Sequence, residues 1–423
     1  MAMSVALGTA VKDNMPPLAI VLHWLPKPSE TFIYDEISLF RQWAVPFHVF
    51  TLYGPWPGRL SPAMSDEHWP ITRLGSRAVP RLMSAVGFWL KANGPVARQL
   101  WRTIPWRRWG DLETTGENLW AFLCGFHIGR QVREMGAGHI HAPWANGPAT
   151  AAWVASRLTG LPFSFSAWAG DIFPPDGALA DKIRDSSFVR CTCRTFLHHL
   201  QQQELSSSGK IRVLLNGQDP ARFDPVERLH RPPWQLLGLG RFVAKKGFAD
   251  ALRAAAQLKE KGLDFHLTLA GDGPERRRLE RLARSLGLDG HVSFPGFMPR
   301  HQAGELFRTA DILLMPSVVD PAGDRDGIPN VIMEALLCGI PVIASATGAI
   351  GELIRDGDTG RLVPPGRPEA LADAVLELIA HPAAARALAA RGREAVQRDH
   401  NLETNTRLLL ELIAQHSKSR NAR

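Results

Sequence analysis

Short apolar runs alternate with longer amphipathic stretches through most of this 423-residue chain. In the first half, an apolar run at residues 18–25 ends at Pro26-Lys27-Pro28, and residues 30–43 then carry apolar side chains at helical spacing. Further strand-like runs lie at 139–142, 163–166 and 188–192. Alternation of this kind is typical of parallel α/β layers, in which helices connect buried strands.

The second half repeats the alternation more regularly, and no internal repeat is evident. Its apolar runs predict strands at 234–240, 265–270, 292–294, 312–316 and 342–345. Its amphipathic stretches predict helices at 248–261, 274–286, 301–310, 331–337, 370–379, 383–399 and 402–415.

A change in composition marks the boundary between the halves. Residues 216–220 read Asn-Gly-Gln-Asp-Pro, and Pro225, Pro232 and Pro233 follow. Glycine, proline and charge in this density are typical of a linker. We therefore expect an α/β protein of two doubly wound, Rossmann-like domains that face each other across a cleft. The predicted segments are a first domain at 1–216, a linker at 217–233, a second domain at 234–399, and a final helix with a basic tail at 400–423 that crosses back toward the first domain.

The composition is that of a soluble globular protein, with 45% hydrophobic and 21% charged residues. No apolar run approaches the length of a membrane-spanning helix, and residues 1–11 lack the charged and apolar regions of a secretory signal. The four cysteines, Cys124, Cys191, Cys193 and Cys338, show neither a disulfide framework nor zinc-type spacing. These features predict a cytoplasmic protein with reduced cysteines.

The formal net charge of +8 predicts an anionic partner. Nucleic acid is disfavoured, because the chain has no zinc-finger spacing, no aromatic RNA-binding signature and no basic heptad region. Anionic lipid or a phosphorylated substrate agrees better with where the charge lies.

Much of the charge lies in a basic stretch at residues 73–109, which has eight basic residues, no acidic residue and four tryptophans. The basic residues are Arg73, Arg77, Arg81, Lys91, Arg98, Arg102, Arg107 and Arg108, and the tryptophans are Trp89, Trp101, Trp106 and Trp109. Cationic, tryptophan-bearing stretches without a spanning segment are typical of proteins that lie on anionic membranes. We expect this stretch to contact such a surface. The alternative is a basic helical face of a soluble domain whose tryptophans are buried.

Two carboxylates in the second half are separated by a turn. Asp326 and Glu334 lie eight residues apart in the segment Asp-Gly-Ile-Pro-Asn-Val-Ile-Met-Glu. Gly327 and Pro329 keep Asp326 off the helix that carries Glu334. Free backbone N–H groups at the start of that helix suit a phosphate, and carboxylates suit sugar and ribose hydroxyls. The spacing therefore predicts a site for a nucleotide-linked sugar.

Two loops with glycine follow predicted strands in the same half. Residues 240–247 place Arg241 and Lys246 where ligands of open α/β sheets bind, and such cations suit a diphosphate. The alternative is a solvated basic loop. In residues 270–274, Gly271 lets the backbone approach a ligand or merely completes a turn.

These motifs together resemble the family 4 retaining glycosyltransferases of the GT-B fold. The segments that carry the resemblance, in the order of that family, are GRFVAKKG, LAGDGPE, VSFPGFMP, ADILLMPS, DGIPNVIMEALLCGIPVIAS, TGAIGEL and DGDTGRLVPPG. In the first half, the segments PKPSETFIYDE, HIHAPWA and LPFSFSAWAGDIF resemble the bacterial exopolysaccharide, colanic-acid-type branch, which assembles lipid-linked repeat units.

The resemblance implies roles for the charged residues of the second half. Arg241 and Lys246 match the basic pair that holds the donor diphosphate and offsets the charge of the leaving group. Glu334 matches the residue that binds the ribose hydroxyls. Asp326 stands where the family usually has glutamate, the carboxylate that contacts the transferred sugar. The expected donor-binding positions besides these are Gly240, Gly271, Phe297 beside the nucleobase, Gly327, Ile328, Asn330, Val331 and Glu352.

In the first half, His141 matches a histidine that follows a strand and reaches the donor sugar, with a structural histidine as the alternative. Where relatives commonly have a histidine in a Thr-Ala-His-x-x-Asp segment, this chain has Trp168, which can stack on a sugar but cannot exchange a proton. Asp171 keeps the acidic position, either as an acceptor contact or as a helix cap.

Ser29, Glu30 and Thr31 close the loop after the first predicted strand. We expect them to contact the acceptor or a phosphate, or to begin a helix with Ser29 as its N-cap. The two roles are compatible.

The resulting hypothesis is a retaining, metal-independent glycosyltransferase without a cofactor. It would move a sugar from a UDP- or GDP-linked donor to a lipid-linked oligosaccharide acceptor in surface polysaccharide synthesis. It would lie on the inner face of the plasma membrane through residues 73–109, with no nucleic acid as partner. The alternatives are a transferase acting on a soluble acceptor such as an aminoglycoside, and a catalytically silent sugar-nucleotide-binding scaffold subunit.

Overall fold

The computed structural model describes residues 15–418 apart from 59, 61, 66–68, 108 and 226–230. The chain divides into two compact units: the first runs to Leu215 and resumes at Leu402, and the second spans Asn216–Asn401. Parts of the sequence predictions lie outside the described residues, namely the N-terminal segment 1–11, Arg108, part of the expected linker at 226–230 and the end of the basic tail at 419–423.

Within the described residues, the first unit is built on a seven-stranded parallel sheet with the order β3-β2-β1-β4-β5-β6-β7. Its strands are β1 (Leu18–Leu22), β2 (Phe47–Thr51), β3 (Ile71–Arg73), β4 (His139–Ala142), β5 (Phe163–Ala167), β6 (Phe188–Cys191) and β7 (Ile211–Val213). β1 pairs in parallel with β2 on one side and with β4 on the other. All of β1 is buried, as expected for a parallel strand covered on both faces.

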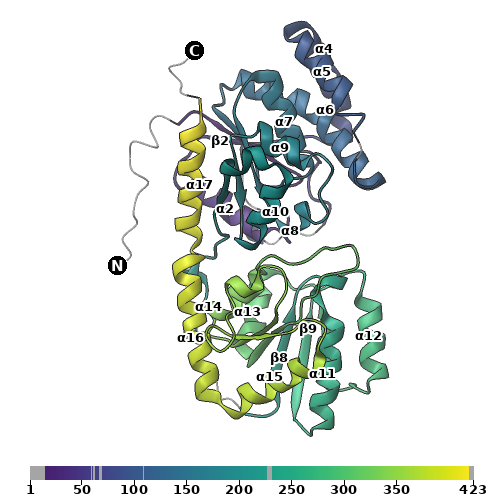
Figure 1. The fold of residues 1–423 in the computed structure, drawn as a ribbon, viewed down its shortest axis with the longest axis vertical. Coiled ribbons are helices and arrows are strands. Elements are labelled where there is room, and N and C mark those ends of the chain that lie inside the picture. The colour runs from purple at the N-terminus through teal and green to yellow at the C-terminus, as the bar shows by residue number, and fades with distance from the viewer. Residues whose placement is uncertain are drawn as a thin grey trace. The chain divides into compact units, whose positions relative to one another are not determined.

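Helices cover this sheet, and some of them form a group at one side of the unit. The helices are α2 (Thr31–Gln42), α3 (Pro62–Ser65), α4 (Val79–Ala92), α5 (Gly94–Thr103), α6 (Leu112–Glu134), α7 (Gly147–Thr159), α8 (Ala169–Ile172), α9 (Leu179–Asp185), α10 (Thr195–Gln203) and α17 (Leu402–His416). Figure 1 shows α4, α5, α6 and α7 together. α6 and α7 pack so closely that a Cβ atom on Gly125 would lie 2.6 Å from the Cβ atom of Val154. α17 packs against α2 and β4.

In the part of the second unit that the structure describes, six parallel strands have the order β10-β9-β8-β11-β12-β13. They are β8 (Trp234–Leu239), β9 (Phe265–Ala270), β10 (Val292–Gly296), β11 (Ile312–Met315), β12 (Val342–Ser345) and β13 (Arg361–Val363). The helices are α11 (Phe248–Glu260), α12 (Arg276–Ser285), α13 (Arg300–Thr309), α14 (Asn330–Leu337), α15 (Pro368–Ala380) and α16 (Pro382–Asp399). One apolar core packs α11, α12 and α15 on the sheet, and a separate core packs α13, α14 and α16 on it (Figure 1).

The parallel α/β layers agree with the sequence prediction in both units. The first strand is shorter than predicted, because β1 ends at Leu22 and residues 23–25 leave the sheet. Residues 44–134 form β2, β3 and α3 to α6, for which no element was predicted. Their apolar pattern is weak, since β2 and β3 are short and contain polar residues.

The described residues of the expected linker fall within the second unit. The backbone N–H of Gln218 donates to the carbonyl oxygen of His400 over 2.8 Å, and His400 Nδ1 lies 2.9 Å from the carbonyl oxygen of Asn216. The segments that enter and leave this unit are therefore joined by hydrogen bonds. Among the described residues, no helix is long and apolar enough to cross a membrane.

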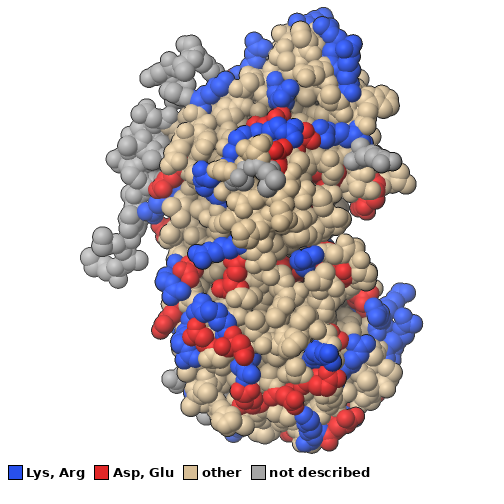
Figure 2. Space-filling view, viewed as in Figure 1, with Lys and Arg blue, Asp and Glu red and all other residues tan. Residues whose placement is uncertain are grey.

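The basic stretch predicted to contact a membrane forms α4, α5 and the turn after α5. Its exposed cations are Arg73, Arg77, Arg81, Lys91, Arg98 and Arg102. Trp89 and Trp109 are buried, whereas Trp106 is 82% exposed. Val79, Met83 and Leu90 are exposed apolar residues along one side of α4. Figure 2 shows blue side chains without red ones on the part of the first unit that α4 and α5 form.

A buried ion pair joins α2 to β6 in the first unit. Arg190 is 1% exposed, and its Nη1 donates to Glu36 Oε2 over 2.6 Å. Its Nε and Nη2 donate to the carbonyl oxygens of Leu214 and Leu215 over 3.1 and 3.2 Å. Charges so far from water are tolerated only when their partners are in place.

We expect Arg190→Ala to lower the free energy of unfolding by about 3–5 kcal/mol, because Glu36 would stay buried without its partner. Arg184→Ala is the matched control, since Arg184 pairs with Glu204 over 2.6 Å at the surface, where solvent screening leaves an ion pair with little effect on stability. Urea unfolding followed by circular dichroism measures both variants. Equal losses in the two variants would contradict the prediction.

Candidate active site

Each sheet has one place where its strand order reverses. In the first unit this place lies between β1 and β4, and in the second it lies between β8 and β11. The loops that leave such neighbouring strands diverge, so ligands of open α/β sheets bind outside the carboxyl ends of the strands there. Both reversal points carry charged side chains in this protein.

In the second unit, a cation, a carboxylate and a hydroxyl meet at the reversal point. Lys246 comes from the loop after β8, and its Nζ donates to Asp326 Oδ2 over 3.0 Å. Ser317 follows β11, and its Oγ donates to the same Oδ2 over 2.7 Å. Asp326 is 6% exposed. Lys246 and Asp326, which were predicted to lie in one donor site, are thus brought together, whereas Arg241, the other member of the predicted basic pair, is exposed.

The loop that carries Asp326 is held by further polar contacts. Lys245 Nζ lies 2.8 Å from Asp324 Oδ2, so the neighbouring lysines Lys245 and Lys246 each hold one carboxylate of this loop. The side chain of Asp320 accepts the backbone N–H groups of Ala322 and Asp324 over 2.9 Å each. These contacts fix the position of a loop that has no regular secondary structure.

Asp326 lies in the loop before α14 and Glu334 on the helix, as the glycine and proline spacing predicted. α14 begins at Asn330, whose Oδ1 accepts a hydrogen bond from Asn216 Nδ2 over 2.8 Å. Gly327 and Ile328 are partly exposed before the helix, and Val331 is buried in its first turn. The start of α14 therefore follows Asp326 by only four residues in the chain.

Glycines allow the loops around this pair to touch through their backbones. At Gly271, with φ of 147°, a Cβ atom would lie 1.8 Å from the carbonyl oxygen of Gly240. At Gly348, with φ of 56°, it would lie 1.8 Å from the carbonyl oxygen of Asp326. The backbone at Gly271 thus makes a close approach, as predicted for this glycine, but its partner is the backbone of the loop that contains Gly240.

The other donor-side positions lie farther along the sheet edge. Phe297 follows the edge strand β10 and is largely exposed. Glu352 ends a short helical turn, Ile350–Glu352, after β12 and is partly buried. Their expected contacts with a nucleotide stay predictions. Among the described residues, no group of His, Cys, Asp and Glu side chains is arranged to hold a metal ion.

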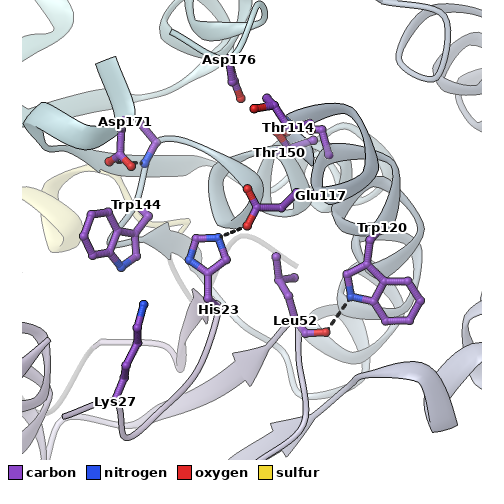
Figure 3. Close-up of polar contacts among 12 residues, drawn as sticks. His23, Lys27, Leu52, Thr114, Glu117, Trp120, Trp144, Thr150, Asp171 and Asp176 are labelled. Atoms are coloured by element: carbon purple, nitrogen blue, oxygen red, sulfur yellow. Dashed lines mark hydrogen bonds and ion pairs between the residues drawn. The ribbon is translucent and has the colours of Figure 1, made fainter. Parts of the chain in front are cut away.

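In the first unit, an ion pair lies at the reversal point. His23 directly follows β1, and its Nε2 lies 3.0 Å from Oε1 of Glu117 on α6 (Figure 3). Gly147, the first residue of α7, is close enough that a Cβ atom there would lie 3.4 Å from Glu117 Cγ and 3.5 Å from His23 Nε2. Burial alone would raise the pKa of Glu117, but the hydrogen bond and charge of His23 hold the pKa below its ordinary value. Glu117 is therefore ionised at neutral pH.

Aromatic rings lie next to this pair. The Trp24 ring stacks on Tyr53 with centroids 4.5 Å apart, and Trp56 meets Trp24 edge-on at 5.4 Å. The Lys27 ammonium lies 5.3 Å from the Trp24 centroid and 5.7 Å from the Trp56 centroid. We call these three rings the aromatic platform.

Of the predicted segment Ser29 to Thr31, Glu30 is the residue whose side chain contacts Lys27, which lies beside the platform. α2 begins at Thr31, and its N-cap is Glu30 rather than Ser29, with no hydrogen bond from a side chain to the helix start. The expectation of a Ser29 cap is therefore wrong. The Glu30 side chain instead accepts from Lys27 Nζ over 2.5 Å and from Trp144 Nε1 over 3.3 Å, which directs it toward the loop after β4.

Trp168 and Asp171 join the loops after β4 and β5. Trp168 Nε1 donates to the carbonyl oxygen of Pro143 over 2.7 Å. Asp171 Oδ2 accepts the backbone N–H groups of Ala145 over 3.0 Å and Trp168 over 3.3 Å. Burial raises the pKa of Asp171 to about 8, although these two N–H groups oppose the shift. Asp171 thus caps α8, and its contact with an acceptor stays a prediction.

His141 lies inside β4, which agrees with the strand predicted at 139–142 but not with the place after a strand that the family resemblance implied. It is 1% exposed, its Nδ1 lies 2.9 Å from Ser164 Oγ, and its Nε2 lies 3.4 Å from Ser166 Oγ. Burial lowers the pKa of His141 well below its ordinary value, so the ring is neutral. The strand placement has a simple cause: β4 pairs with β5 from Ile140 to Ala142, which keeps His141 within the ladder.

Sequence inspection missed His23, Glu117 and the platform. The predicted first strand extended to residue 25, which hid His23 and Trp24 inside it. Glu117 is one acid on a long helix, and no local pattern distinguishes it. The available signal was the pair His23-Trp24 directly after a fully apolar run.

The raised pKa of Asp171 predicts a pH-dependent stability. Between its ordinary value of 3.8 and about 8, the folded protein holds a proton that the unfolded chain releases, so stability falls as pH rises through this range. Asp171→Asn can still accept both N–H groups and does not titrate. From about pH 5 to about pH 8, wild type should lose more unfolding free energy than Asp171→Asn, on the order of a few kcal/mol. If the urea midpoints of wild type and Asp171→Asn changed equally with pH, the prediction would be refuted.

Comparison with known proteins identifies the second unit. Residues 222–395 match the family model described as "Glycosyl transferases group 1". The chain is 36% identical over 208 residues to the putative colanic acid biosynthesis glycosyltransferase WcaL of Escherichia coli (strain K12), covering 48% of this chain and 51% of that protein. It is 32% identical over 223 residues to the amylovoran biosynthesis glycosyltransferase AmsK of Erwinia amylovora, covering 51% and 54%. The chain spans about half the length of these curated relatives.

A solved structure resembles the whole fold. The crystal structure of Anabaena Alr3699/HepE in complex with UDP and glucose matches with a TM-score of 0.69 and 18% identity, covering 94% of this chain and 99% of that chain. Together with the two parallel sheets, this likeness shows the GT-B fold that the motifs predicted. The segment matched by the family model contains Lys246, Asp326 and Glu334. The chain therefore carries a glycosyltransferase group 1 domain in its second unit.

Proposed function

We propose that this protein transfers a sugar from a nucleoside-diphosphate sugar to a lipid-linked saccharide during synthesis of a bacterial surface polysaccharide. The observation that carries the proposal is the meeting of Lys246, Ser317 and Asp326 at the strand reversal of a glycosyltransferase group 1 domain. The names of the relatives support it, because they refer to colanic acid and amylovoran biosynthesis. The solved structure with UDP and glucose supports a UDP-linked donor, with GDP as the other candidate base.

In this proposal the second unit binds the donor. Lys246 and the exposed Arg241 meet the diphosphate, since an ammonium and a guanidinium both bind phosphate oxygens well. The backbone N–H groups around the start of α14 add further donors. Asp326 meets hydroxyls of the transferred sugar, and Glu334 meets those of the ribose. No metal ion is needed, because the two cations offset the diphosphate charge.

The chemistry then follows from charge and geometry. The bond between the anomeric carbon and the β-phosphate oxygen breaks, and both of its electrons leave with the diphosphate, whose added charge Lys246 and Arg241 stabilise. The acceptor hydroxyl oxygen bonds to the anomeric carbon from the same face, so the configuration is retained. The hydroxyl proton passes to the departing phosphate, which makes a separate protein base unnecessary.

Donor binding is tested by the melting temperature of the full chain with UDP-, GDP- and ADP-hexoses. A donor at about 100 times its Kd adds about 2.7 kcal/mol of stability. We expect one nucleotide class to stabilise the wild type, and Lys246→Ala and Glu334→Ala to lose most of that effect. Lys261→Ala is the control, because Lys261 ends α11 at the end opposite Lys246 and pairs with Asp373 at the surface. Undiminished stabilisation in Lys246→Ala and Glu334→Ala would rule out this donor site.

The acceptor is proposed to reach the first unit from a membrane surface. The exposed cations of α4 and α5, with exposed Trp106 and the apolar side of α4, form the basic α4–α5 surface. Such a surface suits anionic lipid headgroups, with the apolar side chains entering the interface. We place the protein peripherally on the cytoplasmic face of the inner membrane. Trp89 and Trp109 are buried in the first unit, so they are not part of this surface.

Membrane docking is tested by co-sedimentation with vesicles. Neutralising Lys91, Arg98 and Arg102 to glutamine should weaken binding to phosphatidylglycerol-containing vesicles by roughly 100-fold, at about 1 kcal/mol per cation. The control neutralises Arg277, Arg281 and Arg284, which are exposed on α12 of the second unit. Equal binding of wild type to pure phosphatidylcholine vesicles, or an equal loss in the control, would refute docking through this surface.

A further inference from the structure

The reversal point of the first unit holds side chains that the donor chemistry does not use. His23, Glu117 and the platform rings come from three separate segments: the loop after β1, the helix α6, and the loop after β2 at residues 53 and 56. All of them gather at the carboxyl edge of one sheet (Figure 3 shows His23 and Glu117 there). This is the edge at which a ligand of the first unit is expected.

The platform is accessible, unlike the neighbouring rings of Phe50 and Trp69 in the same unit. Trp24, Tyr53 and Trp56 are all partly exposed, and so is Lys27 beside them. Phe50 and Trp69, which lie nearby in sequence, are buried in the core. Rings that served packing alone would be covered in the same way. Half-covered aromatic faces next to polar groups are instead typical of ligand sites.

The polar groups beside the platform suit hydroxyls. Glu117 is ionised, and the side chains of His23 and Tyr53 both interact with it. Burial and the nearby Glu117 charge raise the pKa of Tyr53 to about 12, so its hydroxyl keeps its proton at neutral pH. A carboxylate that retains partial exposure can accept hydrogen bonds from further hydroxyl groups.

The local charge argues against an anionic ligand. Lys27 is the cation nearest the rings, and it is already paired with Glu30 over 2.5 Å. Glu30 and Glu117 balance the charges of Lys27 and His23. A phosphate or a uronic acid would therefore meet cations that already have carboxylate partners, whereas a neutral sugar ring can place its C–H face on an indole and its hydroxyls on the carboxylate.

We propose that the aromatic platform, with Glu117 positioned by His23, binds a neutral sugar ring of the acceptor. The inference rests on the proposed glycosyltransferase function and names the acceptor's chemistry within it. Glu117 and the platform contact the sugar. His23 is a positioning residue, because it holds the Glu117 carboxylate and is itself almost fully buried.

The test uses the full-length chain and methyl α- and β-hexosides as probes, with binding followed by saturation-transfer NMR titration. We expect at least one neutral methyl hexoside to bind the wild type, and Trp56→Ala and Glu117→Ala each to weaken it about 10-fold or more. Trp56→Phe should restore most of the Trp56→Ala loss. His23→Gln should weaken binding less than Glu117→Ala.

Trp43→Ala is the matched control, because Trp43 is a partly exposed tryptophan at the opposite end of α2, with Arg407 over its ring at 6.0 Å. It should bind like the wild type. Tighter binding of methyl glucuronide than of methyl glucoside would overturn the neutral assignment. No hexoside binding to the wild type, or equal binding by Trp56→Ala, would overturn the site.

Donor-induced stabilisation, measured on the same variants, separates the two proposals. Trp56→Ala should respond to the nucleotide sugar as the wild type does. If no nucleotide sugar stabilises any variant while hexoside binding still depends on Trp56, the proposed transferase function fails and this sugar site stands. If the donor binds normally and the hexosides ignore these substitutions, only the sugar site fails.

Discussion

Parallel pairing on both sides of β1, and on both sides of β8, determines where this chain can act on a ligand. A parallel strand must be connected to the next by a right-handed crossover, so successive helices fall on a face set by the direction of travel along the sheet. Where that direction reverses, two adjacent loops turn away from each other and their backbone groups stay accessible. Lys246 and Asp326 meet at one such point, and His23 and Glu117 at the other. The apolar cores of the two units hold the strands, and with them these strand ends, in place.

The two reversal points differ in how their charges are held. In the second unit, lysines from one loop bind carboxylates from another, and glycine contacts such as Gly348 against Asp326 let the backbones approach. In the first unit, an imidazole and a carboxylate lie beside aromatic rings, with little unpaired cationic charge. The second unit also has the exposed Arg241 in the loop after β8, so a polyanionic ligand is favoured there and a neutral, hydroxyl-bearing one in the first unit. This division of charge suits a donor and an acceptor.

The sequence was a better guide to the second unit than to the first. Regular alternation and local motifs located its strands, and the Gly327 and Pro329 spacing placed Asp326 in a loop and Glu334 on α14. The first unit depends on contacts between distant segments. Glu117 reaches His23 from a helix far along the chain, and pairing with β5 draws His141 into the sheet. Likewise Ser29 had a suitable cap side chain, but Glu30 took the N-cap position and used its carboxylate on Lys27 and Trp144. Single-residue propensities contain no information on such long-range competition.

The Lys246–Asp326 pair has a consequence for which anions the second unit can select. Asp326 acts as a resident counter-ion, already neutralising Lys246 from a position almost closed to water. An incoming ligand must exchange with it, so the free energy of binding is the difference between two ionic contacts and not the value of one. A singly charged anion gains almost nothing from such an exchange. A diphosphate gains more, and it frees the carboxylate for a neighbouring hydroxyl. The internal Lys246–Asp326 ion pair can thus make the second unit select a diphosphate over a singly charged anion.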